Sequence, residues 1–138
     1  MRILLDTNIV LDLLLDKEPF SKDAMEIFSL IESKYLEAYL CATTITTIHN
    51  LISKSLQKNQ TDRIIEDLLQ LFHIAEVHKE ILLLSLKNNA KDFEDSVLYT
   101  SAKFSDVDVI ITRDKKGFKN SSVLVQEPKQ FLASLIKS

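Results

Sequence analysis

Short apolar runs separated by segments of helical periodicity constrain this chain more than any other feature. Ile3-Leu4-Leu5 and Val109-Ile110-Ile111-Thr112 are apolar on both faces of an extended chain, which is typical of strands buried on both sides in a parallel sheet. Helical segments between such strands predict crossovers that cover both faces of the sheet. We therefore expect an α/β fold with three layers, α/β/α, around a central, mostly parallel sheet. Further strands are expected at residues 38–42, 74–77 and 123–125.

Helices are predicted where apolar residues recur at three- and four-residue spacing. Ile45, Ile48 and Ile52 form one such stripe, and Gln60-Thr61-Asp62 provides a cap for the helix that follows it. Glu18-Pro19 separates the first two helices, because proline disfavours helix in the residue before it. The expected helices occupy residues 8–15, 20–33, 61–72, 80–86 and 92–104, with two more starting at residues 43 and 128. With 138 residues and no linker or repeat, we expect one domain, residues 1–138.

Rare residue types exclude several classes of protein. The single glycine, Gly117, cannot form a dinucleotide fingerprint, a P-loop or a nucleophile elbow, each of which needs two or more glycines. The single cysteine, Cys41, permits no internal disulfide, and the three histidines do not have the spacing of a zinc protease. The first apolar run is too short for a signal peptide, and no apolar stretch is long enough for a membrane span. We therefore expect a cytoplasmic protein that is not inserted in a membrane.

Charge is unevenly distributed along the chain. The formal net charge is −3, which argues against a protein that binds nucleic acid through bulk positive charge. Residues 103–138 nevertheless contain seven basic and four acidic residues, so the remainder carries −6. This division suits a site in which acidic metal ligands lie beside a basic rim that contacts phosphate, but chance variation in composition could also produce it.

Acidic residues follow two of the predicted strands and begin one of the predicted helices. Asp6 follows the first strand, Asp114 follows the strand that ends near Thr112, and Asp92-Phe93-Glu94-Asp95 begins a helix. Each also has an ordinary interpretation as a helix cap or turn residue. Residues that leave parallel strands converge at one sheet edge, where three carboxylates repel one another unless a cation neutralises them. Carboxylates without thiolates favour Mg²⁺ or Mn²⁺, which in turn indicates phosphoryl chemistry.

Three motifs follow one another along the chain: Leu5-Asp6-Thr7-Asn8, Asp92-Phe93-Glu94-Asp95 followed by Ser101-Ala102, and Ile111-Thr112-Arg113-Asp114 ending in Gly117-Phe118. Together they resemble the motifs of the PIN domain family, the nuclease fold of VapC-type toxins and related RNA-cleaving proteins. The resemblance spans nearly the whole chain and implies a PIN-like fold. It also implies that Asp6 and Asp95 are metal ligands and that Asn8 and Thr112 orient the acidic cluster.

The chain departs from the family pattern at two positions that usually carry an acid. His49 stands where the family has a glutamate on the third helix, and Gly117 stands where an acid precedes the phenylalanine. Asp114 is our first candidate for the missing oxygen ligand, with Glu94 and Asp12 as weaker candidates. His49 is interpreted either as a metal or water ligand or as a hydrogen-bonded core residue.

The resemblance leads to a functional hypothesis. We expect a metal-dependent endoribonuclease that hydrolyses RNA phosphodiester bonds, with Asp6, Asp95 and Asp114 holding Mg²⁺ or Mn²⁺. The expected contacts to the RNA backbone come from Arg113, Lys115, Lys116 and Lys119. A homodimer and, for a toxin of a toxin–antitoxin pair, an antitoxin protein are the implied partners.

Alternative functions compete with the ribonuclease. A catalytically weakened PIN-like module that only binds RNA or protein would also explain His49 and Gly117. A phosphoacceptor receiver domain needs a pair of adjacent acids after the first strand, whereas this chain has only Asp6 there. A haloacid-dehalogenase phosphatase needs an Asp-x-Asp motif, and the chain has Asp6-Thr7-Asn8 instead.

Overall fold

Five parallel strands form the centre of the molecule. In this computed structural model, residues 1–88, 92–118 and 121–136 are described. The strands lie in the order β3-β2-β1-β4-β5, and every neighbouring pair is parallel. Their bounds are β1 Arg2–Leu5, β2 Glu37–Cys41, β3 His73–Ala75, β4 Val109–Ile111 and β5 Leu124–Gln126. The five expected strands are therefore confirmed, with small shifts of their ends.

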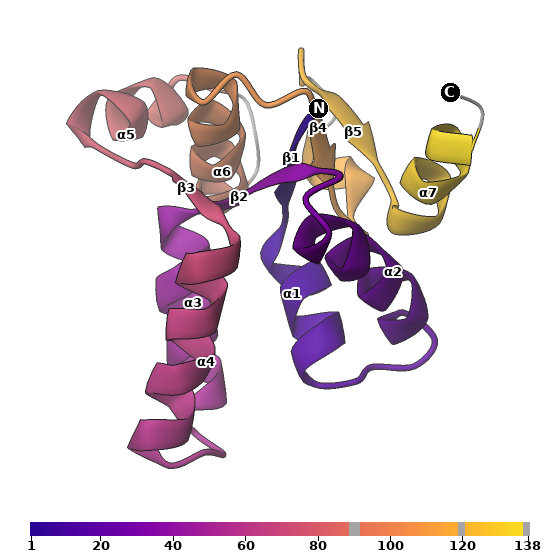
Figure 1. Cartoon of the computed structure of the whole chain (residues 1–138). Helices are drawn as coiled ribbons and strands as arrows, with labels where there is room; N and C mark the ends of the chain where they lie inside the picture. The colour runs from indigo at the N-terminus through magenta and orange to yellow at the C-terminus, as the bar shows by residue number, and fades with distance from the viewer. Residues whose placement is uncertain (89–91, 119–120, 137–138) are drawn as a thin grey trace.

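Helices connect the strands as crossovers and cover both faces of the sheet (Figure 1). Their bounds are α1 Thr7–Leu14, α2 Ser21–Glu32, α3 Ala42–Ile52, α4 Lys58–Leu71, α5 Lys79–Leu86, α6 Phe93–Phe104 and α7 Pro128–Ile136, with a short 3₁₀ helix, η1, at Lys115–Phe118. The three-layer α/β/α fold expected from the sequence is confirmed. The part of the chain that the structure describes contains no helix with the length and apolar composition of a membrane span.

The two apolar clusters of the core lie on opposite faces of the sheet. Because side chains alternate along a strand, Ile3 and Leu5 of β1 pack into one cluster and Leu4 packs into the other. The first cluster contains apolar residues of α1, α2, α3, α4 and α7. The second contains Leu98 and Ala102 of α6, together with Phe118 of η1. The buried strands hold the loops at their carboxyl ends in a fixed relation to one another.

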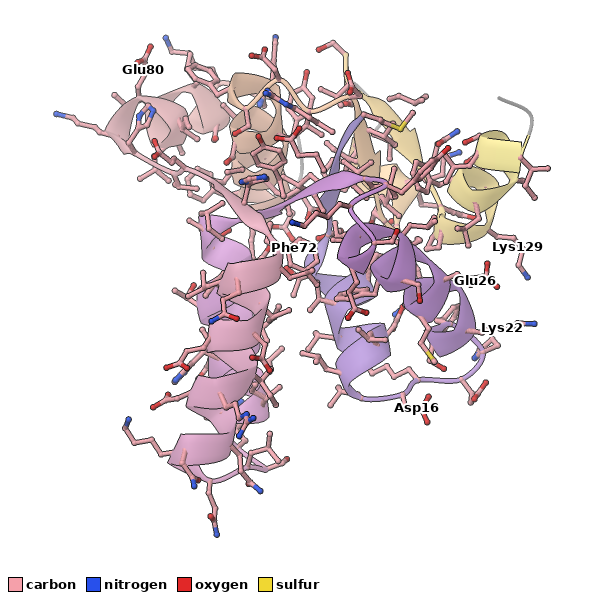
Figure 2. The ribbon with its side chains drawn as sticks, in the orientation of Figure 1. Asp16, Lys22, Glu26, Phe72, Glu80 and Lys129 are labelled. Atoms are coloured by element: carbon pink, nitrogen blue, oxygen red, sulfur yellow. The ribbon has the colours of Figure 1, made fainter. Side chains whose placement is uncertain are left out.

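The helix α2 is amphipathic, and its apolar face packs against the core of the same chain. Its buried residues include Ala24, Ile27 and Ile31, whereas Lys22 and Glu26 point outward from the molecule (Figure 2). Phe28 of α2 meets Phe72, at the end of α4, edge to face with ring centroids 5.5 Å apart. The apolar stripe of α2 is therefore buried within the chain itself.

The helices α3 and α4 lie side by side and extend away from the sheet (Figure 1). The sequence predicts a cap for α4 at Gln60-Thr61-Asp62, and this prediction is wrong: α4 begins at Lys58 with Gln57 as its N-cap. Gln57 and Gln60 cap each other reciprocally, because each side chain bonds the backbone of the other residue. Glutamine is not among the preferred capping residues, so the earlier start gives little signal in the sequence.

Candidate active site at the carboxyl edge of the sheet

The strand order places a crevice beside the carboxyl ends of β1 and β4. From β1, the chain crosses to β2 on one side, whereas β4 and β5 lie on the other side. This reversal is a topological switch point, where α/β proteins commonly bind ligands. The backbone N–H of Asp6 donates to the carbonyl of Ile111 over 2.9 Å, which ties the residue after β1 to the end of β4. The loops that carry Asp6 and Thr112 are therefore neighbours.

Asp6 is held by hydrogen bonds at both carboxylate oxygens. Its Oδ1 accepts from the backbone N–H of Thr7 over 2.7 Å, and its Oδ2 accepts from the hydroxyl of Thr112 over 2.8 Å. Burial raises the pKa of Asp6, while the hydrogen bonds from Thr112 and Thr7 lower it. The negative charges of Asp114 and Glu94 raise this pKa further. Asp6 is thus both the N-cap of α1 and a member of an acidic cluster.

Side-chain hydrogen bonds of Asn8 and Thr112 join the two loops. The amide nitrogen of Asn8 lies 3.4 Å from Asp6 Oδ2 and 3.4 Å from the Thr112 hydroxyl, and its oxygen accepts from the backbone N–H of Arg113 over 3.4 Å. The fully buried Thr112 hydroxyl also accepts from the backbone N–H of Asp114 over 3.0 Å. This network fixes the Asp6 carboxylate relative to the backbone of Asp114.

Asp95 shares the edge with several other carboxylates. Burial, followed by the negative charges of Asp6, Asp92, Asp114 and Glu94, raises the pKa of Asp95 to about 6. We name these five carboxylates, Asp6, Asp92, Glu94, Asp95 and Asp114, the acidic cluster. The structure therefore brings Asp6, Asp95 and Asp114 to one edge from three distant parts of the chain.

The first turn of α6 carries three members of the acidic cluster. Asp92 is the N-cap and accepts from the backbone N–H of Glu94 over 2.8 Å. Glu94 points towards α3, where its carboxylate accepts from the hydroxyl of Thr47 over 3.3 Å. Asp92 and Thr47 are absent from the site residues expected from the sequence. The repeated threonines of α3 were the available signal, and Thr44 likewise contacts the Thr7 hydroxyl at 3.0 Å.

His49 takes neither of the two expected positions. Its imidazole is exposed, so the interpretation as a core residue is wrong. The ring faces Asp62 of α4, with 3.7 Å between Nε2 and Oδ1. Thr47 is the residue of α3 that reaches Glu94. Because successive residues of a helix point about 100° apart, His49 points to a different side of α3 from Thr47.

Asp12 and Arg113 bind each other. Arg113 donates from Nε to Asp12 Oδ2 over 2.6 Å and from a terminal nitrogen to Oδ1 over 3.1 Å, and its guanidinium lies 4.0 Å from the centre of the Phe20 ring. Asp12 is 1% exposed. The sequence suggested Asp12 as a weaker candidate for a metal ligand, but its carboxylate is paired with a cation. It also suggested Arg113 as a contact to the RNA backbone, but its guanidinium is turned into the protein.

Two of the other expected basic residues, Lys115 and Lys116, lie in η1. Lys115 and Lys116 are exposed, and Lys115 donates to the side-chain oxygen of Gln130 over 3.3 Å. Lys119 lies outside the described residues. Lys115 and Lys116 therefore lie directly after Asp114 in the chain.

The acidic cluster has the donor chemistry of a site for a hard divalent cation. It offers only carboxylate oxygens, and burial and mutual repulsion raise the pKa values of Asp6 and Asp95, a repulsion that a cation would relieve. In the described part of the chain, no three acidic, histidine or cysteine side chains already surround a position for a metal ion. The residues therefore fit Mg²⁺ or Mn²⁺ by chemistry and charge.

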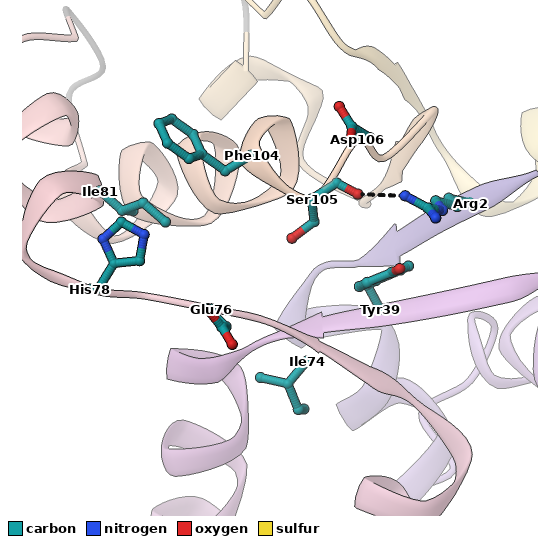
Figure 3. Close-up of a pocket in the computed structure, with 9 residues that line it drawn as sticks. All are labelled: Arg2, Tyr39, Ile74, Glu76, His78, Ile81, Phe104, Ser105 and Asp106. Atoms are coloured by element: carbon teal, nitrogen blue, oxygen red, sulfur yellow. Dashed lines mark hydrogen bonds between the residues drawn. The ribbon is translucent and has the colours of Figure 1, made fainter.

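A separate cavity of about 360 Å³ lies between α6 and the segment that joins β3 to α5 (Figure 3). Its lining includes Arg2, Tyr39, His78 and Phe104, and the Arg2 guanidinium donates to the carbonyl of Ser105 over 3.2 Å. None of its described lining residues belongs to the acidic cluster. The cavity and the candidate active site are therefore different places.

The fold and the site define a class: a doubly wound parallel α/β protein with a carboxylate cluster at its switch point. A family model described as PIN domain matches residues 2–116 of the chain. The chain belongs to the PIN domain family.

Relatives agree with this assignment. The chain is 26% identical to Ribonuclease VapC1 of Aquifex aeolicus (strain VF5), over 85% of this chain and 84% of that protein. Its fold is similar to that of VapBC-1 from nontypeable Haemophilus influenzae, with a TM-score of 0.70, 20% identity, and 94% and 99% of the two chains covered. FitAcB from Neisseria gonorrhoeae gives a TM-score of 0.69 at 21% identity, covering 92% and 98%.

Proposed function

We propose that this protein is a metal-dependent endoribonuclease that hydrolyses RNA phosphodiester bonds. The observation that carries the proposal is the position of Asp6, which hydrogen bonds fix at the switch point beside Asp95 and Asp114. The name of the Aquifex relative, a ribonuclease, supports the same reaction.

Asp6, Asp95 and Asp114 would hold the divalent ion. A Mg²⁺ or Mn²⁺ ion held by these carboxylates would supply Lewis acidity toward a water molecule and positive charge beside the phosphate oxygens. Thr112 and Asn8 keep the Asp6 carboxylate oriented, and Thr47 does the same for Glu94. Lys115 and Lys116 lie in the segment directly after Asp114, where their charges attract the RNA backbone.

A cleavage assay with purified protein tests this proposal. We expect cleavage of RNA only when Mn²⁺ or Mg²⁺ is added, and we expect Asp6→Asn to abolish it while the melting temperature changes by only a few degrees. Asp16→Asn is the matched control, because Asp16 lies in the loop after α1, far from the sheet edge (Figure 2). Cleavage that survives Asp6→Asn would place the chemistry elsewhere.

Calorimetry with Mn²⁺ distinguishes the nuclease from a module that only binds RNA or protein. His49 and Gly117, which stand at two positions where the family usually has an acid, give this second candidate its support. A nuclease should bind Mn²⁺ with a stoichiometry of one or two ions, and Asp6→Asn should weaken this binding. A module without catalysis should bind RNA but show no specific uptake of Mn²⁺.

We also propose that the protein is the toxin of a toxin–antitoxin pair and forms a homodimer. Solved structures with the same fold include one described as a toxin-antitoxin complex from Klebsiella pneumoniae, with a TM-score of 0.69. Expression together with the product of a short neighbouring reading frame should yield a complex in which RNA cleavage is blocked. Light scattering on the purified protein measures its oligomeric state.

A further inference from the structure

The only glycine of the chain, Gly117, lies directly against the carboxylate of Asp95. A Cβ atom placed on Gly117 would lie 2.6 Å from Asp95 Oδ2 and 3.3 Å from Asp95 Cγ. Its backbone φ is outside the left-handed region, so the backbone conformation itself does not require glycine. The missing side chain is therefore explained by the space that the Asp95 carboxylate occupies.

The backbones on both sides of this contact are held by the core. Phe118, the next residue in η1, is 6% exposed and packs in the same cluster as Leu98 and Ala102 of α6. Ser96 and Val97, which follow Asp95 in α6, are also buried. Because neither segment can move away cheaply, a side chain at position 117 would displace the Asp95 carboxylate instead.

We propose that Gly117 is a positioning residue that lets the Asp95 carboxylate lie over η1, facing Asp6 and Asp114, in the orientation needed to ligate the divalent ion. This inference rests on the proposed function, since it assigns Asp95 to the metal. It accounts for the missing side chain at this position of η1 in this chain, where the family usually has an acid. Metal affinity is the property most sensitive to it, since small shifts of ligand orientation change affinity by about 10- to 100-fold.

The first test measures Mn²⁺ binding by calorimetry in the full chain. We expect Gly117→Ala to weaken binding by about tenfold or more. In an Asp95→Ala background, the same change should have no further effect, because the displaced carboxylate is already gone. Unchanged Mn²⁺ affinity in Gly117→Ala, with normal binding by the wild type, would overturn the positioning role alone.

Thermal unfolding without metal tests the contact independently of function. Replacing a glycine by alanine normally stabilises a chain through its unfolded state when the native backbone accepts the change. We expect this gain in melting temperature for Gly117→Ala in the Asp95→Ala background and its loss in the wild-type background. Glu94→Ala serves as the control, because it removes a neighbouring carboxylate but leaves Asp95 in place; Gly117→Ala should therefore bring no gain there.

The two tests separate the possible failures. An equal effect of Gly117→Ala on the melting temperature in all backgrounds would show that Gly117 and Asp95 are not coupled, which overturns the inference. A wild-type protein that binds no Mn²⁺ and cleaves no RNA would overturn the proposed function. It would overturn the positioning role as well, even if thermal unfolding shows that Gly117 and Asp95 are coupled.

Discussion

Asp95 is stabilised poorly as an anion in the metal-free protein. It is partly buried, and the other members of the acidic cluster surround it with negative charge, which together raise its pKa to about 6. Sites that bind cations commonly carry such a local cost, because the arrangement of ligands is optimal only when the ion is present. The destabilisation of the folded protein by ionised Asp95 therefore depends on pH and can be measured.

We expect Asp95→Asn to stabilise the metal-free protein at pH 7.5. The pKa of Asp95 is about 6 in the folded state and 3.8 in a model peptide. The protonated carboxyl therefore favours folding; its contribution is complete below about pH 4 and is lost as the pH rises through about 6. Allowing for solvent screening, the gain should be on the order of 1 kcal/mol at pH 7.5 and close to zero at pH 4.

Chemical denaturation in the presence of a chelator measures this difference, with Asp16→Asn as the control. Added Mn²⁺ should reverse the order of stability, because only the wild type gains the cation. A variant that is less stable than the wild type at pH 7.5 without metal would contradict the assignment of repulsion to Asp95.

Sequence reasoning identified some residues of the site and missed others for identifiable reasons. Asp6, Asn8 and Thr112 follow strands that are recognisable from their apolar runs, so their convergence follows from the topology. The pairing of Arg113 with Asp12 depends on the course of the loop after β4, which no periodicity reveals. The contact between Gly117 and Asp95 depends on a fraction of an ångström of space between two elements.

At the scale of elements, a salt bridge connects α1 to the loop after β4. Asp12 belongs to the middle of α1, and Arg113 follows Thr112 directly. The bidentate geometry and the stacking of the guanidinium on Phe20 restrict how this loop can move. Because the same loop carries Asp114, the salt bridge also limits where that carboxylate can lie.

We expect Asp12→Ala to lower the free energy of unfolding by about 3 kcal/mol, since it leaves the partly buried Arg113 charge without its partner. Lys58→Ala is the control, because it breaks the exposed pair with Asp62, whose atoms are 2.7 Å apart, and it should lower the free energy of unfolding far less than Asp12→Ala does. Urea denaturation of both variants measures the difference. Equal effects of the two substitutions would mean that the Arg113 pair is no stronger than a surface pair.

The elements themselves follow closely from periodicity and strand patterning. All five strands and all seven helices of the described residues occur where the sequence predicts them, whereas η1 was not expected. A single 3₁₀ turn has too few residues to show a period. The start of α4 was missed for a related reason, since the reciprocal cap between Gln57 and Gln60 uses residues that are common anywhere in a helix.

At the scale of the whole molecule, an acidic chain must hold a polyanion under the proposed function. The net charge of −3 opposes RNA, so local positive charge beside the acidic cluster has to provide the attraction. Lys115 and Lys116 are the described lysines in that position. Because RNA is attracted by these lysines and repelled by the net negative charge of the chain, RNA binding should depend strongly on salt concentration.

We expect the double variant Lys115→Ala and Lys116→Ala to weaken RNA binding to a similar extent for all sequences. The slope of the logarithm of affinity against the logarithm of salt concentration should become shallower by about 0.7 for each phosphate that the variant no longer neutralises. Lys22→Ala, on the outer side of α2, should leave the slope unchanged (Figure 2). Filter binding at several salt concentrations, with metal omitted to prevent cleavage, measures these slopes.

Because β1 pairs with a strand near the end of the chain, the candidate active site can form only late in synthesis. The first strand pairs with β4, a segment made more than a hundred residues later, and Asp6 is anchored to Ile111 through that pairing. A ribosome has therefore produced most of the polypeptide before the two halves of the crevice can meet. Under the proposed function, a chain that ends before β4 lacks Thr112 and Asp114 and should therefore not cleave RNA.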